Sequence, residues 1–341
     1  MMLSPQDATM LRGRLIDWQT LMSFKNWFPV TISEEAGQAL VWWRFMGAAR
    51  FEAAFFQDSL ATQPSAERLV CKTPLSALAD ICQSFVDSVP PTAFVFHVSR
   101  CGSTLLTQML AALPSCVVMS EPPVLDAFFR LHHAWPEQSG GRHTLKLLLA
   151  ALGQRRSAQE QHFFVKLDSW HTPWMAFVRE VFPALPVVFL YRQPEEVLAS
   201  HRRQRGQQMV PGLLDTSRLL PDLAGVAAAD LDAYAVRVLE AIFASAATPA
   251  EARQFTLLNY SQLPDIVWTE LLPWWGICPD AAQHTALLDR AGFHSKHGGM
   301  KFEGDSKPLL AGLAQNHEML ARLYAQLEKK RLGDEAPGRM G

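Results

Sequence analysis

The chain has 341 residues, of which 49% are hydrophobic and 19% charged, and its formal net charge is −2. This composition is typical of a globular protein with a sizeable core and excludes wholesale disorder. The near-neutral balance provides no global basic field for a nucleic acid or an anionic membrane, so any anion site must be built locally.

The cysteines and the start of the chain bear on the compartment. The five cysteines are scattered without a Cys-x-x-Cys pair, at Cys71, Cys82, Cys101, Cys116 and Cys278. This pattern argues against a zinc site or a disulfide framework and favours a reducing compartment. The start of the chain lacks the features of a signal peptide, and no stretch approaches the roughly 20 apolar residues that span a bilayer. We therefore expect a cytoplasmic protein without a membrane span that binds no nucleic acid.

Residues 1–88 are rich in apolar and aromatic side chains. Some of them, such as Leu11 and Leu15, recur at helical spacing, and aromatic residues are dense in segments 39–46 and 51–56. We predict a mainly helical N-terminal extension over residues 1–88. It either packs on a larger core or forms a wall over a binding pocket.

Beyond Pro90 and Pro91, short β-rich runs alternate with helical patterns. The predicted strands are 93–98, 116–119, 163–167, 187–191 and 255–258. The predicted helices are 105–113, 174–182, 194–205, 225–246, 263–274 and 309–330. This alternation indicates an α/β domain, over residues 89–332, with a central parallel sheet covered by helices. A disordered tail is predicted over residues 333–341.

The loop Ser99-Arg100-Cys101-Gly102-Ser103-Thr104 lies between a predicted strand and a predicted helix. A helix N-terminus presents unpaired N–H groups and partial positive charge to an anion. Gly102 allows close approach of the backbone, and Arg100 supplies a cation. Ser103 and Thr104 add hydroxyl donors. The kinase pattern G-x-x-x-x-G-K-[ST] is absent because no lysine precedes the Ser-Thr pair. An ordinary capped helix is the alternative on local sequence alone.

A second candidate phosphate site follows the predicted strand 187–191. Arg192 comes at the carboxyl end of this strand, where α/β sheets place their ligands, and a proline follows two residues later. Ser200 lies eight residues beyond Arg192, about two turns along the next helix. Together these residues could bind a second phosphate. The basic residues that follow fit a solvated helix face at least equally well: Arg202, Arg203 and Arg205.

Both segments resemble motifs of the sulfotransferase superfamily. Phe-His-Val-Ser-Arg-Cys-Gly-Ser-Thr-Leu-Leu is similar to its 5′-phosphosulfate loop, in the arginine variant, and Leu-Tyr-Arg-Gln-Pro-Glu-Glu-Val-Leu-Ala-Ser is similar to its 3′-phosphate motif. The resemblance covers about residues 90–310. It implies a P-loop NTPase-like α/β fold that binds the sulfate donor 3′-phosphoadenosine 5′-phosphosulfate (PAPS).

By this resemblance, the residues of the loop Ser99–Thr104 hold the 5′ end of PAPS, and Arg192 and Ser200 hold its 3′-phosphate. Cys101 stands where the family usually has serine, at a position that contributes mainly its backbone. The glycine-rich and basic segment 298–307 resembles the late loop that closes over the nucleotide. Lys301 and Lys307 are the candidate ligands there, with a surface turn as the alternative.

The catalytic candidates follow two other predicted strands. Glu121 comes just after strand 116–119 and is similar to the general base of related sulfotransferases. Lys166 ends the next strand and resembles the lysine that, with Arg100, stabilises the charge that develops on the transferring group. Asp168 is the second candidate for the base. The structural alternatives are a helix cap or an ion pair for Glu121, and a snorkelling side chain for Lys166.

The function implied is transfer of a sulfuryl group from PAPS to a hydroxyl or amine, with release of adenosine 3′,5′-bisphosphate. The acceptor is a small molecule, a carbohydrate or a peptide. No metal is expected, because the sulfuryl group carries a single charge and no aspartate cluster is evident. The alternatives are a P-loop kinase that uses ATP, disfavoured by the missing lysine, and a non-catalytic nucleotide-binding or partner-docking module.

Overall fold

The computed structural model describes residues 5–214, 230–247, 255–292 and 317–334. Its internal contacts divide the chain into two compact units. The first unit comprises Met1–Ala93, Thr107–Leu167 and Pro279–Gly298. The second unit comprises Phe94–Leu106, Asp168–Cys278 and Gly299–Gly341. Each unit is therefore assembled from segments that are distant in the sequence.

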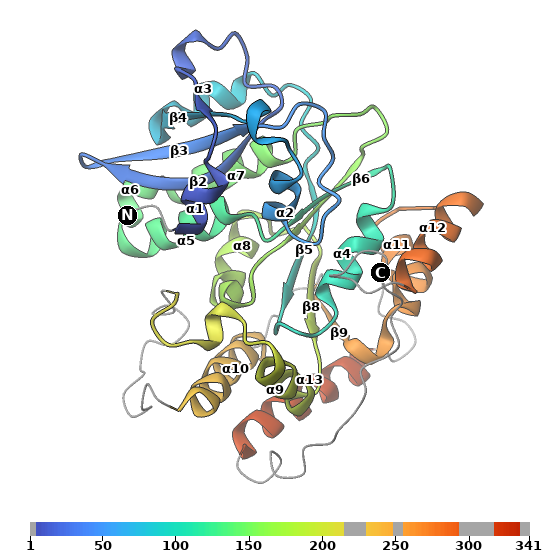
Figure 1. The fold of residues 1–341 in the computed structure, drawn as a ribbon. Helices are drawn as coiled ribbons and strands as arrows, with labels where there is room; N and C mark the ends of the chain where they lie inside the picture. The colour runs from blue at the N-terminus through green and yellow to red at the C-terminus, as the bar shows by residue number, and fades with distance from the viewer. Residues whose placement is uncertain (1–4, 215–229, 248–254, 293–316, 335–341) are drawn as a thin grey trace. The chain divides into compact units, whose positions relative to one another are not determined.

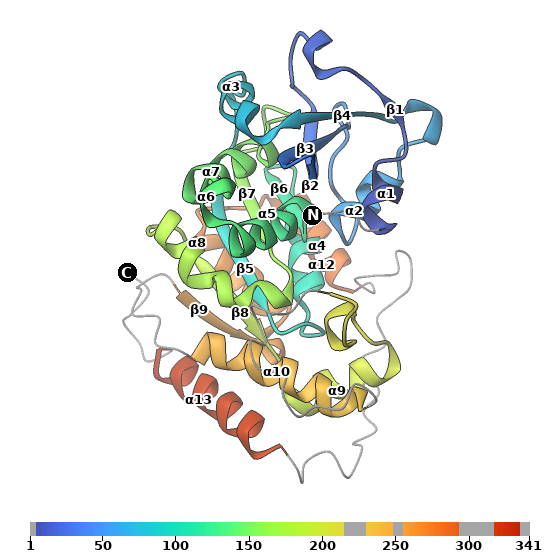
Figure 2. The same cartoon turned by 90° about the vertical axis from the view of Figure 1, so that its left-hand side faces the viewer.

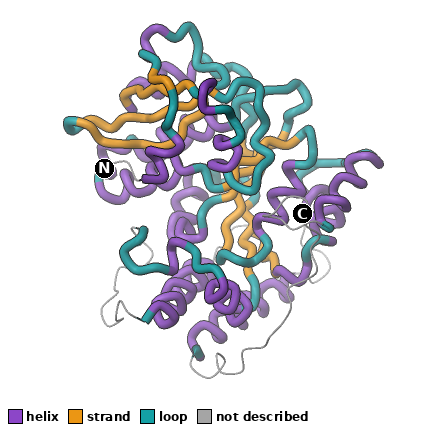
Figure 3. The backbone as a smooth tube through the Cα atoms, viewed as in Figure 1, coloured by secondary structure: helices purple, strands orange, loops and turns teal. Residues whose placement is uncertain are grey.

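The N-terminal part of the first unit is built on a β-sheet, so the prediction of a mainly helical extension is wrong. Figure 3 shows its strands in orange. In the order β1-β4-β3-β2, the strands are β1 (Arg14–Leu15), β4 (Leu69–Pro74), β3 (Gln38–Phe45) and β2 (Trp27–Glu35). Its helices are short: α1 (Pro5–Met10), α2 (Phe56–Ala61) and α3 (Leu78–Gln83), with 3-10 turns at Trp18–Thr20, Ser65–Glu67 and Leu75–Ala77.

The reason for this difference is a tight hairpin. Strands β2 and β3 pair antiparallel and are joined at Ala36 and Gly37, whose φ angles are +51° and +79°. Two consecutive positive φ angles are the signature of the two-residue turn whose twist matches paired strands. The aromatic residues around it favour the pleated surface of a sheet. Trp43, for example, is buried on β3, and its Nε1 donates to Thr73 Oγ1 of β4 at 3.0 Å.

The rest of the first unit contains two parallel strands and several helices. Strands β6 (Cys116–Ser120) and β7 (His162–Lys166) pair in parallel, with Ser120 opposite Lys166. The helices are α5 (Pro123–Ala134), α6 (Pro136–Ser139), α7 (Gly141–Leu152), α12 (Ala281–Ala291) and the later turns of α4 (Ser103–Ala111). Both α5 and α7 pack against β2.

The second unit carries most of β5 (Pro91–His97), together with β8 (Val187–Tyr191) and β9 (Phe255–Asn259). These strands pair in parallel, and Tyr191 lies opposite Asn259. The helices of this unit are α8 (Met175–Val181), α9 (Pro194–Arg203), α10 (Leu231–Ala247), α11 (Leu272–Trp274) and α13 (Glu318–Asp334). Short turns lie at Ser169–Trp174, Gln207–Met209, Tyr260–Gln262 and Val267–Leu271. Figures 1 and 2 show α9, α10 and α13 side by side.

The sheet has five parallel strands in the order β6-β7-β5-β8-β9 and is flanked by helices, which confirms the predicted α/β fold. Strands β6 and β8 are buried along their whole length, as expected of continuous apolar runs in a sheet covered on both faces. Among the described helices, none has the length and hydropathy to cross a bilayer. The predicted tail beyond Asp334 lies outside the described residues.

Candidate functional site

The loop that follows β5 has an unusual backbone. The φ angles are +70° at Ser99, +50° at Arg100 and +87° at Gly102. Residues other than glycine rarely adopt this left-handed conformation, and the strain is usually retained at functional sites. Backbone N–H groups in such turns form a concave anion-binding surface. Helix α4 begins directly afterwards, at Ser103. The loop therefore has the geometry of an anion cradle at a helix N-terminus.

Side chains of the loop fasten it to its own unit. The buried Cys101 thiol donates to the carbonyl of Leu190 in β8, with 3.2 Å between Sγ and O. Arg100 Nη2 donates to the carbonyl of Gln204, just after α9, at 2.6 Å. Cys101 can therefore offer a ligand only its backbone. The Arg100 guanidinium is anchored at the end of α9, a role that the sequence did not indicate.

Tyr260, the first residue after β9, lies beside both predicted phosphate motifs. A Cβ atom at Gly102 would lie 2.7 Å from Cδ2 of the Tyr260 ring. The guanidinium of Arg192 lies 4.2 Å from the centroid of the same ring. Arg192 Nη1 also approaches the carbonyl of Arg100, at 3.5 Å. The structure thus brings Arg192 and the loop together around one aromatic ring. No role was predicted for Tyr260 from sequence, although its position after a parallel strand could have indicated one.

Arg192 is largely buried and already has a carboxylate partner. Its Nε pairs with Oε2 of Glu196 at 2.5 Å, one helical turn along α9. Burying a guanidinium is costly unless it is paired, so Glu196 compensates its charge. Ser200 lies further along α9 and is half-buried. Lys301 and Lys307 lie outside the described residues.

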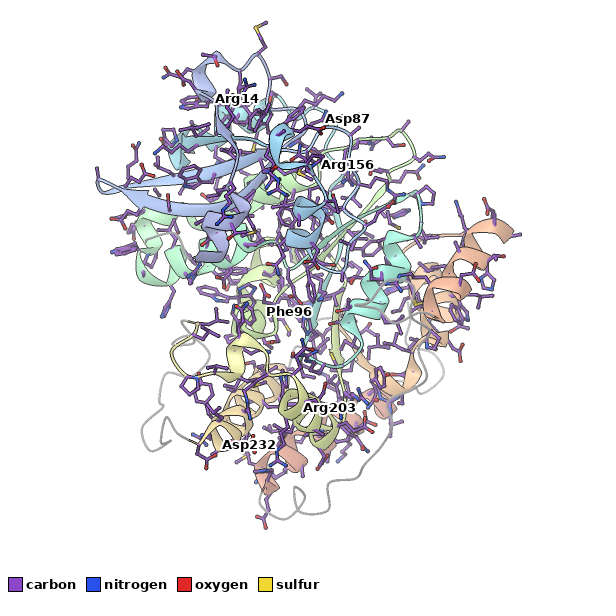
Figure 4. All side chains as sticks on the ribbon, viewed as in Figure 1. Arg14, Asp87, Phe96, Arg156, Arg203 and Asp232 are labelled. Atoms are coloured by element: carbon purple, nitrogen blue, oxygen red, sulfur yellow. The ribbon has the colours of Figure 1, made fainter. Side chains whose placement is uncertain are left out.

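Two of the three basic residues at the end of α9, Arg202 and Arg205, share one carboxylate. Asp232 lies near the start of α10 and is labelled in Figure 4. Its Oδ2 lies 2.9 Å from Arg202 Nε, and its Oδ1 lies 2.8 Å from Arg205 Nη2. Hydrogen bonds from Arg205, together with the charges of both arginines, lower the pKa of Asp232, although burial acts in the opposite direction. These contacts join the end of α9 to α10, so Arg202 and Arg205 contribute to the packing of the two helices.

Glu121 and Lys166 form an ion pair in the first unit. Lys166 Nζ lies 2.8 Å from Glu121 Oε1, and the lysine side chain is fully buried whereas 19% of the glutamate side chain is exposed. The backbone N–H of Glu121 donates to the carbonyl of Lys166 at 2.8 Å, and Glu121 has a φ of +55°. A strained backbone therefore directs this carboxylate to the ammonium group.

Residues of the N-terminal segment lie near this pair, and Phe55 belongs to the aromatic segment 51–56 that the sequence analysis noted. The ring centroid of Phe55 lies 5.0 Å from Lys166 Nζ. Burial raises the pKa of Asp58, and the negative charge of Glu121 acts in the same direction, against a hydrogen bond from the Phe55 backbone. Gln108 Nε2 donates to the carbonyls of Glu52 and Ala53, each at 2.9 Å, which fastens this segment to α4.

Asp168, the alternative base, lies in a capping position in the second unit. It precedes the turn Ser169–Trp174 and is buried. Its backbone N–H donates to His171 Nδ1 at 3.3 Å, and its Oδ2 lies 3.7 Å from the same nitrogen. This arrangement is typical of the start of a helical turn.

Solved sulfotransferases are similar to this chain in structure. The sulfotransferase domain of the Synechococcus PCC 7002 olefin synthase has a TM-score of 0.42 and 17% identity, over 72% of this chain and 96% of that one. The sulfotransferase domain from the curacin biosynthetic pathway has a TM-score of 0.45 and 15% identity, over 71% and 99%. Sulfotransferase STF9 from Mycobacterium avium has a TM-score of 0.45 and 12% identity, over 63% of this chain and 71% of that one. No family profile matches the chain, and no curated protein does.

Proposed function

We propose that this chain transfers a sulfuryl group from PAPS to a hydroxyl or amine and releases adenosine 3′,5′-bisphosphate. The observation that supports this most is the meeting of two phosphate motifs, 92 positions apart, where Arg192 approaches the Arg100 carbonyl beside Tyr260. An anion cradle next to a separate arginine suits a nucleotide with two separated phosphate groups. The same scattered cysteines that suit a reducing compartment are all free thiols, so we place the reaction in the cytoplasm.

In this proposal the second unit binds the donor. The backbone of Ser99–Thr104 holds the 5′-phosphosulfate, with Arg100 anchoring the loop and contributing its charge. Arg192 and Ser200 hold the 3′-phosphate, and Lys301 and Lys307 contribute further positive charge. The ring of Tyr260 supports both parts, because the Arg192 guanidinium lies over it and a Cβ at Gly102 would collide with it.

The reaction itself is assigned to the residues after β6 and β7. The ionised carboxylate of Glu121 accepts the proton of the acceptor as its oxygen or nitrogen bonds to sulfur. The bond between sulfur and the bridging oxygen breaks, and its electron pair stays on the leaving bisphosphate. Lys166 and Arg100 stabilise the negative charge that develops there. Glu121 is preferred to Asp168 as the base, because its carboxylate is partly exposed and already paired with an ammonium group.

Loss of the Tyr260 ring is expected to weaken nucleotide binding. Tyr260→Leu removes the surface on which the Arg192 guanidinium lies, 4.2 Å from the ring centroid. A cation–π contact of this kind contributes about 1–2 kcal/mol when partly desolvated, so the Kd of adenosine 3′,5′-bisphosphate should rise about 5- to 30-fold. Tyr260→Phe keeps the ring and should stay within about twofold of the wild type on the same ground. Isothermal titration calorimetry measures both, and equal losses in the two variants would contradict the role of the ring.

The direct test of the function has two steps. The first measures binding of adenosine 3′,5′-bisphosphate by the purified chain, in parallel with ATP and Mg²⁺ in a thermal shift assay. The second follows sulfur-35 from labelled PAPS into a panel of alcohols, amines, sugars and peptides. Binding of the bisphosphate and labelled product are the expected results. Failure to bind the bisphosphate at all refutes the proposal, and stabilisation by ATP and Mg²⁺ alone indicates the kinase alternative.

A further inference from the structure

Glu328, on the C-terminal helix α13, joins the carboxyl ends of β8 and β9. The hydroxyl of Tyr191 donates to its carboxylate, and Asn259 Nδ2 donates to Oε1 at 2.9 Å. Tyr191 and Asn259 are the last residues of their strands and are partners in the register of the sheet. One carboxylate, 137 positions from Tyr191 in sequence, therefore holds two neighbouring strand ends.

The residues that directly follow the two strands are Arg192 and Tyr260. Their side chains form the cation–π pair beside the anion cradle, with 4.2 Å from guanidinium to ring centroid. Consecutive Cα atoms are about 3.8 Å apart, so a shift of either strand end is transmitted directly to the residue that follows it. The hydrogen bonds to Glu328 thus fix the starting points of both members of the pair.

The carboxylate of Glu328 is itself firmly held. Arg331 Nη2 lies 2.8 Å from its Oε2, and Tyr324 Oη lies 3.0 Å from Asn259 Nδ2. Partial burial acts to raise the pKa of Glu328, but hydrogen bonds from Arg331, Tyr191 and Asn259 prevail and lower it to about 2. Burial, with the hydrogen bond to Glu328 next, raises the pKa of Tyr191. The acceptor is therefore charged and the phenol protonated across the neutral pH range.

We propose that Glu328 is a positioning residue for the nucleotide: it aligns the ends of β8 and β9 so that Arg192 and Tyr260 receive the 3′-phosphate as a preformed pair. This inference rests on the proposed function, because it assumes that Arg192 binds the 3′-phosphate. Preorganisation increases affinity by removing the cost of ordering the binding groups when the ligand arrives. A helix outside the two sequence motifs would then determine how well the second motif works.

The test compares two nucleotides that differ only in the 3′-phosphate, adenosine 3′,5′-bisphosphate and adenosine 5′-monophosphate. Calorimetry on the full chain gives the Kd of each for the wild type, Glu328→Ala and Glu328→Gln. Glu328→Ala should weaken bisphosphate binding about tenfold, the order expected for loss of hydrogen bonds to a charged group, and monophosphate binding much less. Glu328→Gln retains an oxygen acceptor and should lie between the wild type and Glu328→Ala.

Three controls make the result decisive. Lys329→Ala, at the exposed neighbouring position, should leave both Kd values unchanged. Tyr191→Phe removes only one hydroxyl. It should also weaken bisphosphate binding selectively, and it replaces Glu328→Ala in the test if that variant fails to fold. In an Arg192→Ala background, Glu328→Ala should have no further effect on bisphosphate binding. An equal loss for both nucleotides, or no loss, overturns the positioning role. A wild type that binds neither nucleotide refutes the proposed function instead.

Discussion

Replacement of Lys166 by methionine is expected to lower kcat for sulfuryl transfer by about 100- to 1000-fold, the usual cost of removing one preorganised donor to a developing oxyanion. Methionine keeps most of the apolar stem beneath Phe55, whose ring centroid lies 5.0 Å from Nζ. The carboxylate left behind belongs to Glu121, which is 19% exposed and can be hydrated. The Kd of adenosine 3′,5′-bisphosphate should change little, because the proposed contact with Lys166 strengthens only as charge develops.

The matched control is Lys72→Met. Lys72 makes the same two kinds of contact as Lys166, since its Nζ pairs with Glu35 at 2.5 Å and lies 5.3 Å from the centroid of the Trp42 ring. Its side chain is 35% exposed, and no catalytic role is proposed for it. Turnover of Lys72→Met should equal that of the wild type. Steady-state kinetics with labelled PAPS measures both variants, and equal kcat values for Lys166→Met and the wild type would exclude Lys166 from the chemistry.

Substitution of Gly102 by alanine is expected to weaken binding of adenosine 3′,5′-bisphosphate about 5- to 150-fold. The φ of +87° is unfavourable for alanine, and the new Cβ would lie 2.7 Å from the Tyr260 ring and 2.8 Å from Leu263 Cδ1. The loop or the ring must therefore move, and a cost of about 1–3 kcal/mol for such strain corresponds to this range of affinity. Calorimetry measures the loss, and thermal unfolding shows how much of the strain destabilises the fold.

Gly276→Ala separates backbone strain from loss of the site. Gly276 also lies in the second unit and has a φ of +72°, but a Cβ there would meet nothing within 4 Å. This variant should lower the free energy of unfolding by about 1 kcal/mol, as expected when a side chain is forced into this conformation. Its Kd for the bisphosphate should match that of the wild type. A nucleotide affinity that falls equally in both variants would argue against the loop as the binding site.

The strands of the parallel sheet were predictable from sequence because they are continuous apolar runs. Strand β8 coincides with the predicted 187–191, and β5, β6, β7 and β9 fall within two residues of the predicted limits. The apolar pattern of a buried parallel strand can be recognised from the residues of that strand alone, without knowing which strand it pairs with. Helices α5 and α7 were not predicted, because prolines and glycines interrupt the segment. Gly140, which separates α6 from α7, and Gly141, the first residue of α7, both have positive φ angles.

The N-terminal sheet and the Tyr260 contact were not predictable in the same way. The aromatic residues of β2 and β3 suit a strand or a buried helix, and the two-residue turn at Ala36 and Gly37 decides between them. Tyr260 acquires its position only when β9 pairs with β8, which is a long-range contact. The loop and Arg192 were predicted as phosphate sites from their own residues, whereas the roles of Glu121 and Lys166 came from resemblance to a family. All of these roles stay predictions.

The discontinuous segments of the two units affect how this protein is made. The first unit needs Pro279–Gly298, near the end of the chain, and the second needs Phe94–Leu106, near its beginning. Neither unit can therefore be completed while the ribosome is still in the first half of the message, and contacts between distant segments slow folding. A chain trimmed to residues 89–332 would also lack β2, which packs against α5 and α7. We expect such a fragment to aggregate rather than to fold as an independent domain.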